Sequence, residues 1–272
     1  DLSMLVDRMG RASIVGVSDG GEVITYMQLL KKNAQGGYIW AYRNITATDI
    51  EARRLEVPEV YSELVTWVTP NWSCNIAFLN QDGAIQLLYK PVNKTRWFLQ
   101  NLGAVAPTKA PLVGELTVFQ TAVNRGVHIA GTSENGDVWV TSFRDKAGWS
   151  SRNLTARLKG PKLEIRSLTS YVDRNGVGFI AGIRSDGDIS MYRYAPKKNA
   201  WGKVANVLLT PNWRNMMGRL DATVNAETGE INIVGTLDSA RLVRWTWAAG
   251  RGWQYEDVTQ LLAEAVVRGE GG

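Results

Sequence analysis

The stretch Gly148–Thr155, GWSSRNLT, contains a tryptophan followed four residues later by asparagine and then by an aliphatic residue. The pattern returns, with aspartate once in place of asparagine, as IWAYRNIT at residues 39–46, RWFLQNLG at 96–103 and GWQYEDVT at 252–259, and more loosely as AWGKVANV at 200–207. The tryptophans, which recur at intervals of 57, 52, 52 and 52 residues, are Trp40, Trp97, Trp149, Trp201 and Trp253. A constant period of this length predicts a repeat architecture.

Two further landmarks keep the same phase as the tryptophans. One is a turn followed by an aliphatic residue: SDGGEV from Ser18, QDGAI from Gln81, ENGDV from Glu134, SDGDI from Ser185 and DSARL from Asp238. The other is a short apolar run: IVGV, IAFL, IAGT, IAGI and IVGT, starting at Ile14, Ile76, Ile129, Ile180 and Ile233. Asp-Gly and Asn-Gly between β-rich runs are strong hairpin signals, because both central residues of a type I′ turn need a positive φ. Each unit is therefore typical of four short strands.

Four-stranded units of about 40–50 residues are typical of β-propeller blades. We predict an all-β, five-bladed β-propeller with four antiparallel strands per blade, forming a single domain over residues 1–260. The predicted blades span approximately residues 1–46, 62–103, 114–155, 165–208 and 217–259. A β-sandwich, the alternative, has no reason to repeat tryptophan at a constant interval. Because every repeat contains its four strands in order, we expect the first and last blades to close the ring by packing.

The repeated residues suggest structural roles. We expect each tryptophan to open an outer fourth strand and to fill the gap between neighbouring blades, since large aromatic residues in repeats dominate core energetics. The residues at the end of the pattern, Asn44, Asn101, Asn153 and Asp257, are expected to end each blade by hydrogen-bonding the backbone of the next turn. The functional alternative is that the five tryptophans are stacking platforms for sugars.

The last residues, 261–272, depart from the repeat and predict a short helical or flexible tail. Leu261, Leu262, Ala265 and Val266 would share one face of a helix, which we expect to cover an edge of the last blade. An interaction helix is the alternative. At the other end, DLSMLVDRMG lacks a start methionine, a basic region and an apolar signal core, which suggests a processed form or a piece of something longer.

The composition excludes several kinds of site. Net charge is +5 and no run of like charges exceeds two residues, so a basic tail for nucleic acid is absent. Cys74 is the only cysteine and His128 the only histidine, which leaves no intrachain disulfide, no cysteine-based metal site and no more than one histidine ligand. No phosphate-binding, dinucleotide or calcium-loop motif occurs, and no apolar run approaches about 18 residues. We therefore predict no cofactor, no metal and no membrane insertion.

An enzymatic alternative comes from architecture alone. Some five-bladed propellers are glycoside hydrolases, which need two carboxyl groups at a defined separation. Asp7 and Asp173 share one repeat position and fit turn chemistry better than a single active site. Glu115 and Asp221 are the remaining candidates. An active site needs residues that differ from one repeat to the next, whereas the acidic residues here lie where the repeats are most alike. We therefore favour a protein that is not an enzyme.

Charge is distributed unevenly over the predicted loops. The loops between third and fourth strands carry basic residues, and these candidate ligand-binding residues are Lys31, Lys32, Lys94, Arg144, Lys146, Lys197, Lys198 and Arg251. The turns between second and third strands carry acidic residues such as Asp82 and Asp186. A field of one sign on one face attracts oppositely charged partners, although loops are also charged simply because they are solvated. Nucleic acid is not expected, because the aromatic residues Tyr26, Tyr192 and Trp245 fall at one third-strand position that suits blade packing.

The runs LNQDGAIQLLYKPVNKTRWFLQNL and SENGDVWVTSFRDKAGWSSRNLT resemble propeller repeats of large bacterial extracellular and surface proteins. The blade count, though not the repeat sequence, is similar to that of the five-bladed lectin class typified by tachylectin. The resemblance implies a repeated module outside the cytoplasm that serves adhesion, glycan binding or spacing. It carries over no individual binding residue.

Our hypothesis from the sequence is a non-enzymatic extracellular or cell-surface module that binds glycan or another anionic polymer through its loop faces. Five near-equivalent sites could bind a polymer with high avidity. Two alternatives remain open: a purely structural or adhesive repeat, with neighbouring domains of a larger chain as partners, and an enzyme like the five-bladed glycosidases.

Overall fold

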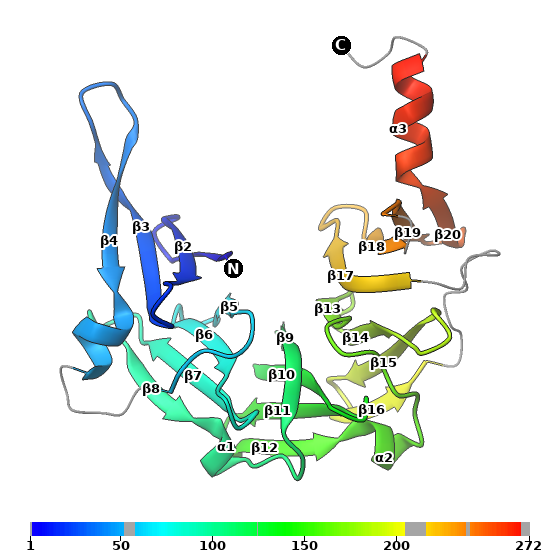
Figure 1. Cartoon of the computed structure of the whole chain (residues 1–272), viewed down its shortest axis with the longest axis horizontal. Helices are drawn as coiled ribbons and strands as arrows, with labels where there is room; N and C mark the ends of the chain where they lie inside the picture. The colour runs from blue at the N-terminus through cyan, green and yellow to red at the C-terminus, as the bar shows by residue number, and fades with distance from the viewer. Residues whose placement is uncertain (1, 52–57, 124, 205–215, 238–239, 268–272) are drawn as a thin grey trace.

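The computed structural model describes residues 2–51, 58–123, 125–204, 216–237 and 240–267. These residues form five antiparallel sheets of four strands, arranged side by side as the blades of a β-propeller (Figure 1). Within every sheet the strands lie in chain order. The predicted fold class, blade number and strand number per blade are confirmed.

The first two blades contain β1 (Leu2–Val6), β2 (Ala12–Val17), β3 (Val23–Lys32) and β4 (Tyr38–Asn44), then β5 (Val65–Val68), β6 (Cys74–Leu79), β7 (Ile85–Lys90) and β8 (Phe98–Asn101). Blade 3 contains β9 (Leu112–Thr121), β10 (Gly126–Ser133), β11 (Val138–Arg144) and β12 (Gly148–Asn153). The last two contain β13 (Thr169–Val172), β14 (Gly178–Ile183), β15 (Ile189–Ala195) and β16 (Ala200–Lys203), then β17 (Met216–Val224), β18 (Ile231–Leu237), β19 (Leu242–Ala248) and β20 (Gly252–Asp257).

The blades share one strand register, so residues at corresponding positions can be compared directly. The isoleucine that recurs in the second strand of every blade is Ile14 in blade 1, where it pairs with Met4 on one side and with Tyr26 on the other. In blade 4 the same position, Ile180, pairs with Ser170 and Tyr192. We call residues related in this way equivalent.

Adjacent blades pack face to face. We call the face that contacts the next blade in the chain the forward face, and the opposite one the rear face. Val15 and Val23 on the forward face of blade 1 form a core cluster with Ile76, Leu88 and Trp97 on the rear face of blade 2. A corresponding cluster fills each later interface. The hydrophobic core is therefore divided into layers between blades.

The repeated asparagines begin short helices. These helices, each starting where a fourth strand ends, are the π-helix η1 (Thr46–Ile50), α1 (Leu102–Val105), α2 (Leu154–Leu158) and α3 (Val258–Val267). Asn153 Oδ1 accepts a hydrogen bond from the Ala156 N–H at 2.8 Å, and Asn44, Asn101 and Asp257 make the same bond three residues ahead. This bond satisfies an amide that the helix itself leaves unpaired.

A threonine completes the pattern in three blades. The hydroxyls of Thr46, Thr155 and Thr259 accept from the first backbone N–H of the third strand, at 2.8–2.9 Å. The Asn-aliphatic-Thr sequence therefore ties the end of a blade to its interior.

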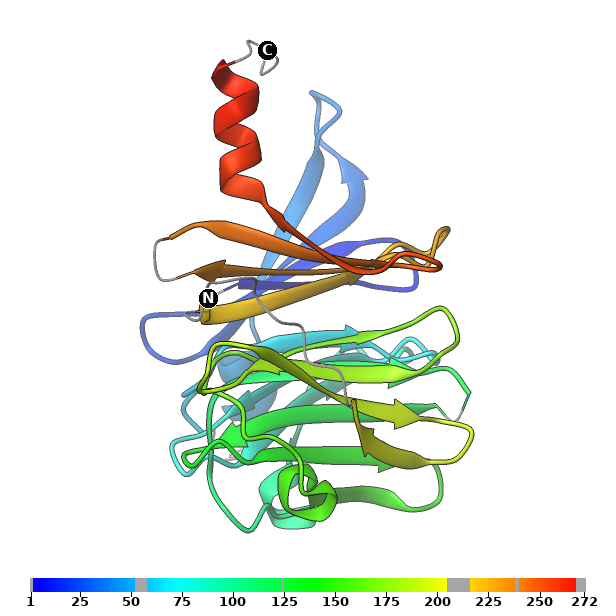
Figure 2. The same ribbon diagram turned by 90° about the vertical axis from the view of Figure 1, so that its right-hand side faces the viewer.

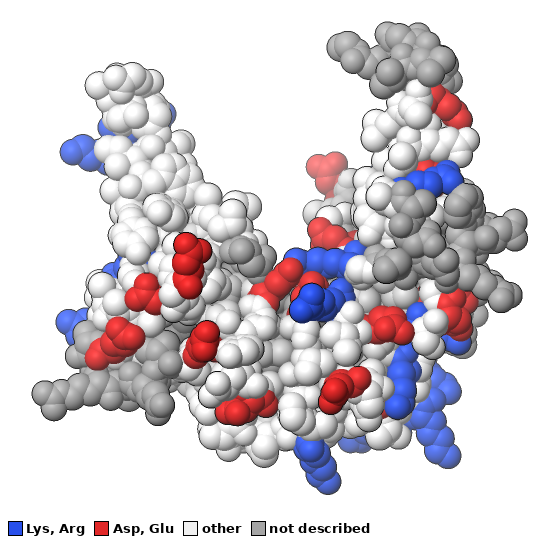
Figure 3. All heavy atoms as spheres, in the orientation of Figure 1, with Lys and Arg blue, Asp and Glu red and all other residues white. Residues whose placement is uncertain are grey.

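The first and last blades do not pack against each other to close the ring, as the sequence predicted they would. Blades 1 and 5 stand on opposite sides of an opening that is visible both in the ribbon and in the space-filling view (Figures 1 and 3). The blades thus form an open arc, and its two end faces are chemically unlike, as described below.

The tail also differs from its prediction. The helix α3 begins at Val258 and projects away from blade 5, instead of lying along its edge (Figure 2). Leu261 and Leu262 are exposed on it. The side chains of Ala265 and Val266 and the residues after 267 lie outside what the structure describes. An apolar stripe of a few residues predicts a helix face but does not say what the face touches.

Candidate ligand grooves between the blades

A groove of 460 Å³ lies between blades 1 and 2. Its walls come mainly from the forward face of blade 1 and the rear face of blade 2, with a contribution from the outer strand β4. They include Leu5, Asp7, Ser13, Met27, Tyr42, Arg43, Asn44, Cys74, Lys90 and Trp97. Trp97 is buried, and the Lys90 ammonium lies 5.3 Å from the centre of its ring. We call this the blade 1–2 groove.

A second groove, of 290 Å³, lies between blades 2 and 3 and is built from equivalent positions. Its walls include Trp67, Thr69, Asn75, Tyr89, Gln100, Val127, Phe143 and Trp149. The strand register makes Ser13 equivalent to Asn75, because they pair with Leu5 and Trp67, which are themselves equivalent. The blade 2–3 groove is therefore a second copy of the blade 1–2 groove.

Between blades 3 and 4 the same space is filled by side chains. His128, equivalent to Ser13 and Asn75, is fully buried against Phe119, Tyr194 and Trp201, with ring centres 4.2–5.6 Å from its own. Its Nδ1 lies 2.8 Å from Ser142 Oγ. Burial, together with the positive charges of Arg144 and Arg152, lowers the pKa of His128 to about 3. The only histidine is thus a neutral packing residue in this interface.

Between blades 4 and 5 an aromatic side chain occupies the equivalent position. Phe179 stacks on Tyr171 with ring centres 4.9 Å apart and packs against the core of this interface. Small or polar residues at this position, Ser13 and Asn75, therefore accompany open grooves, while the larger His128 and Phe179 fill them. The difference in residue size at this position is visible when the repeats are aligned, but size alone does not show that the position faces a groove.

The two open grooves differ in charge. Asp7, Arg43 and Lys90 line the blade 1–2 groove, and Arg43 is ion-paired with buried Asp49. Burial alone would raise the pKa of Asp7, but hydrogen bonds from Arg11 and from the Met9 N–H hold that pKa below its usual value. The residues that line the blade 2–3 groove are uncharged and combine aromatic rings with hydroxyl and amide groups. An adjoining pocket of 260 Å³, which shares Thr69 and Phe143 with this groove, adds Arg125 and Asp145 at its end.

The basic residues singled out from the sequence lie in five separate turns, one in each blade. Lys31 and Lys32 are on the long β3–β4 hairpin that projects from blade 1 (Figure 1), where Lys32 Nζ lies 5.4 Å from the centre of the Tyr38 ring. Lys94, Lys146, Lys197, Lys198 and Arg251 are exposed, whereas Arg144 is half-buried. On the face seen in Figure 3, acidic groups are spread in an arc and basic groups lie mainly at the edge and near the centre. The structure does not bring the eight residues into one site.

Four of the five repeat tryptophans lie at interfaces between blades. Trp97 is buried in the core between blades 1 and 2, and Trp149, Trp201 and Trp253 are half-buried against the preceding blade. Trp40, on the rear face of blade 1, is exposed. Trp97 and Trp149 also line the two open grooves, but Trp97 is only 4% exposed, so the surface left for a ligand is mainly that of half-buried Trp149.

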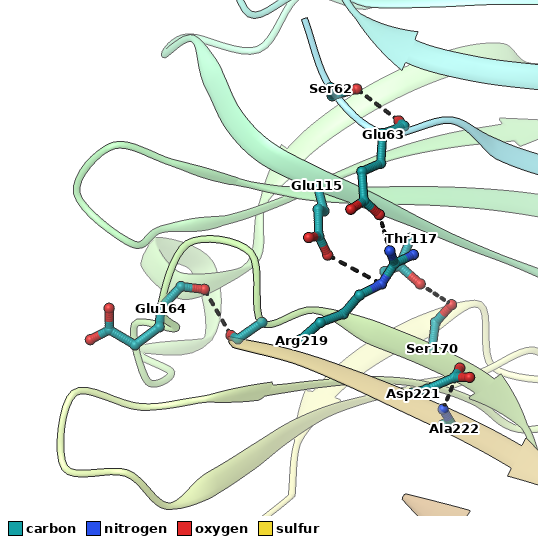
Figure 4. Close-up of polar contacts among 10 residues, drawn as sticks. Ser62, Glu63, Glu115, Thr117, Glu164, Ser170, Arg219, Asp221 and Ala222 are labelled. Atoms are coloured by element: carbon teal, nitrogen blue, oxygen red, sulfur yellow. Dashed lines mark hydrogen bonds and ion pairs between the residues drawn. The ribbon is translucent and has the colours of Figure 1, made fainter. Parts of the chain in front are cut away.

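Figure 4 shows Glu115 and Asp221, the two remaining candidates for catalysis, with their polar contacts. Arg219 of blade 5 forms ion pairs with Glu63, just before β5, and with Glu115 of β9, the latter at 3.4 Å. Burial raises the pKa of Glu115, and Glu63 raises it further against the opposing charge of Arg219. Asp221 points away from this group, and its Oδ1 accepts from the Ala222 N–H. The two proposed catalytic acids therefore do not face one another across an open space.

Among the described residues, no group of three or more His, Cys, Asp or Glu side chains is placed to hold a metal ion. Over the same part of the chain, every helix is too short or too polar to cross a bilayer.

The fold is similar to that of several solved structures. The chain superposes on the BP39L lectin from Burkholderia pseudomallei with a TM-score of 0.70 at 11% identity, covering 93% of this chain and 67% of that one. For AofleA from Arthrobotrys oligospora the TM-score is 0.66 at 11% identity, over 94% of this chain and 70% of that one. For the SapL1 lectin in complex with alpha methyl fucoside the TM-score is 0.61 at 10% identity, over 94% of this chain and 79% of that one. No model of a known protein family and no curated protein sequence matches the chain. At this level of identity the similarity establishes the propeller fold.

Proposed function

We propose that this propeller is a glycan-binding protein, without catalytic activity, whose saccharide sites are the blade 1–2 and blade 2–3 grooves. The observation that carries the proposal is that one set of repeat positions encloses both grooves, each with a tryptophan wall beside polar side chains. A pyranose ring has apolar C–H faces and a rim of hydroxyls, so it suits a pocket that joins aromatic surface to amide and hydroxyl groups.

The similarity to lectins supports the same class of ligand. Two of the solved structures are named as lectins, and one of them holds a methyl fucoside. The uncharged lining of the blade 2–3 groove favours a neutral saccharide there, whereas Lys90 in the blade 1–2 groove could also accept an acidic one. We further propose that the protein acts outside the cell or at its surface, where such ligands are displayed.

The structure suggests how to close each groove without disturbing the fold. Phe179 fills the equivalent space between blades 4 and 5. Asn75→Phe should therefore fill the blade 2–3 groove and Ser13→Phe the blade 1–2 groove. Calorimetric titration with neutral and acidic monosaccharides should show one site fewer for each variant, and at least a tenfold loss of affinity when both are combined.

The matched control is Lys197→Glu with Lys198→Glu, which reverses charge on an exposed turn away from both grooves. We expect its affinity for neutral saccharides to be unchanged. If the groove variants bind normally while this variant loses binding of an anionic polysaccharide, the grooves are not the sites and the basic turns are.

A further inference from the structure

The rear face of blade 1 is uncovered, although the same face is buried in the other four blades. Leu2 is 76% exposed, whereas its equivalents Leu64, Leu116, Leu168 and Leu220 are 2–3% exposed. Tyr26 is 45% exposed, whereas Tyr192 and Trp245 at the same position are 0% and 2% exposed. Trp40 is 42% exposed against 4% for Trp97. The residues of this face therefore match positions that elsewhere form a blade interface.

Large apolar side chains cover this face. The exposed ones are Leu2, Met4, Val6, Tyr26, Trp40 and Tyr42, from β1, β3 and β4. Tyr26 and Tyr42 are cross-strand partners whose ring centres lie 5.4 Å apart. Contiguous apolar patches of this kind mark interaction sites on soluble proteins.

The described residues of the chain supply no complement for this face. The free face at the other end of the arc is the forward face of blade 5. There the Thr246 hydroxyl donates a hydrogen bond to Asn232 Oδ1, and Arg244 is ion-paired with Glu256. Thr223 of this face occupies the position that is Leu5 in blade 1 and Tyr171 in blade 4, as the strand register shows. Pairing this polar face with the rear face of blade 1 would bury a charged pair against apolar surface, which is costly.

The rear face of blade 1 is suited to contact with itself. Besides the six exposed residues, it contains Ala12, Ile14, Gly16, Ile24, Gln28 and Asn44, so none of these positions carries a charge. In an isologous contact the same patch meets itself, and an uncharged patch creates no like-charge repulsion. At roughly 100 Å² of exposed surface for each of the six large side chains, two copies would bury about 1,200 Å² in total. That area is within the range of stable protein interfaces.

We propose that the rear face of blade 1 is a homodimer interface, in which two copies of this chain pack back to back through β1, β3 and β4. The arrangement closes after two copies, because each copy has one such face. The blade 2–3 groove shares no residue with this face, whereas Tyr42 and Asn44 of the face also line the blade 1–2 groove, which therefore lies at the edge of the interface.

The test is sedimentation velocity over a hundredfold range of protein concentration. We expect the unmodified chain to be a dimer and Met4→Lys and Tyr26→Lys to be monomers with unchanged circular dichroism. Thr223→Lys, which places the same charge on the exposed forward face of blade 5, should remain a dimer. A monomeric wild-type chain at all concentrations overturns the proposal and leaves this face to a partner other than a second copy.

A second pair of variants tests the contact with either sign of charge. Met4→Lys and Met4→Glu should each be monomeric, because each would place an unpaired charge in an apolar contact. If both variants are dimeric on their own, the copies do not meet through this face.

Discussion

His128 shows how strongly its surroundings determine the behaviour of a single residue. The side chain lies among Phe119, Tyr194 and Trp201, and its Nε2 has no hydrogen-bond partner. Gly178 lies against the same cluster, and a β-carbon added there would approach the Phe119 ring to 2.0 Å. The filled interface between blades 3 and 4 therefore depends on a neutral imidazole and on the absence of a side chain opposite it.

The lowered pKa of His128 predicts a specific pH dependence of stability. The folded pKa of about 3 is below the ordinary value of 6.5, so between these pH values the unfolded chain binds more protons than the folded protein. This residue therefore contributes stability that is complete above pH 6.5 and is lost as the pH falls toward 3, with a slope of up to about 1.4 kcal/mol per pH unit.

His128→Phe, which copies Phe179, should remove this component. Urea unfolding of the wild type and the variant at several pH values from 7 to 4 measures it as the difference between the two curves. Parallel curves would mean that the histidine is not protonated preferentially in the unfolded state.

At the scale of elements, a blade is stabilised chiefly by its neighbours. Each sheet has a forward and a rear apolar face, and the clusters at the interfaces draw residues from two sheets. The helices between blades add the hydrogen bonds of the asparagine and threonine pattern. A residue at a given repeat position should therefore contribute to the free energy of unfolding mainly where a neighbouring blade covers it.

Trp97 and Trp40 form a matched pair for testing this dependence, since they are equivalent but only Trp97 is covered by a preceding blade. Trp97→Ala should lower the free energy of unfolding by about 3–5 kcal/mol, as for other buried aromatic residues. Trp40→Ala should lower it by about 1 kcal/mol or less. Both are measured by urea unfolding in the Met4→Lys background, so that association does not contribute.

Equal losses for the two tryptophans would contradict interface packing as the source of the effect. Reduced saccharide affinity with unchanged stability for Trp97→Ala would identify that residue as a ligand contact alone.

At the scale of the whole molecule, the arc is held together near its axis by Arg219. This residue of blade 5 is ion-paired with Glu63, which precedes the first strand of blade 2, and with Glu115, which is in the first strand of blade 3. The positions 63, 115, 167 and 219 are equivalent, so a contact across the axis is possible where the repeat supplies opposite charges. The period of the sequence places these residues around the axis, and their charges decide which of them pair.

Arg219→Met should destabilise the protein by about 1–2 kcal/mol at pH 7, a value between those of exposed and buried ion pairs, because Arg219 is more than half exposed whereas the Glu115 side chain is only 10% exposed. The pKa of Glu115 is already raised by burial and by Glu63, and removing the arginine should raise it further. Protonation then relieves the repulsion, so the loss of stability should shrink as the pH falls toward 4.

The measurement is the difference in unfolding free energy between variant and wild type at pH 7 and at pH 4. Arg219→Lys, which keeps the charge, should show a smaller loss at pH 7. A loss that does not change with pH would show that the carboxylates are not the groups Arg219 stabilises.

The sequence by itself determined the propeller, because turns, strands and interface residues recur at one interval and each depends mainly on nearby residues. The period placed five four-stranded blades, and the recurrent residue, asparagine three times and aspartate once, marked the end of four of them. The sequence predicted neither the open arc nor the direction of α3, since both depend on how faces far apart in the chain meet.

The grooves likewise required the tertiary structure. Ser13, Asn75, His128 and Phe179 occupy one repeat position, but only the packed interfaces show that the first two leave space and the last two fill it. The polar forward face of blade 5 and the apolar rear face of blade 1 became distinguishable only once the strand register showed which side each residue faces. Local sequence determines what a blade is, whereas burial by a neighbouring blade decides what each of its faces does.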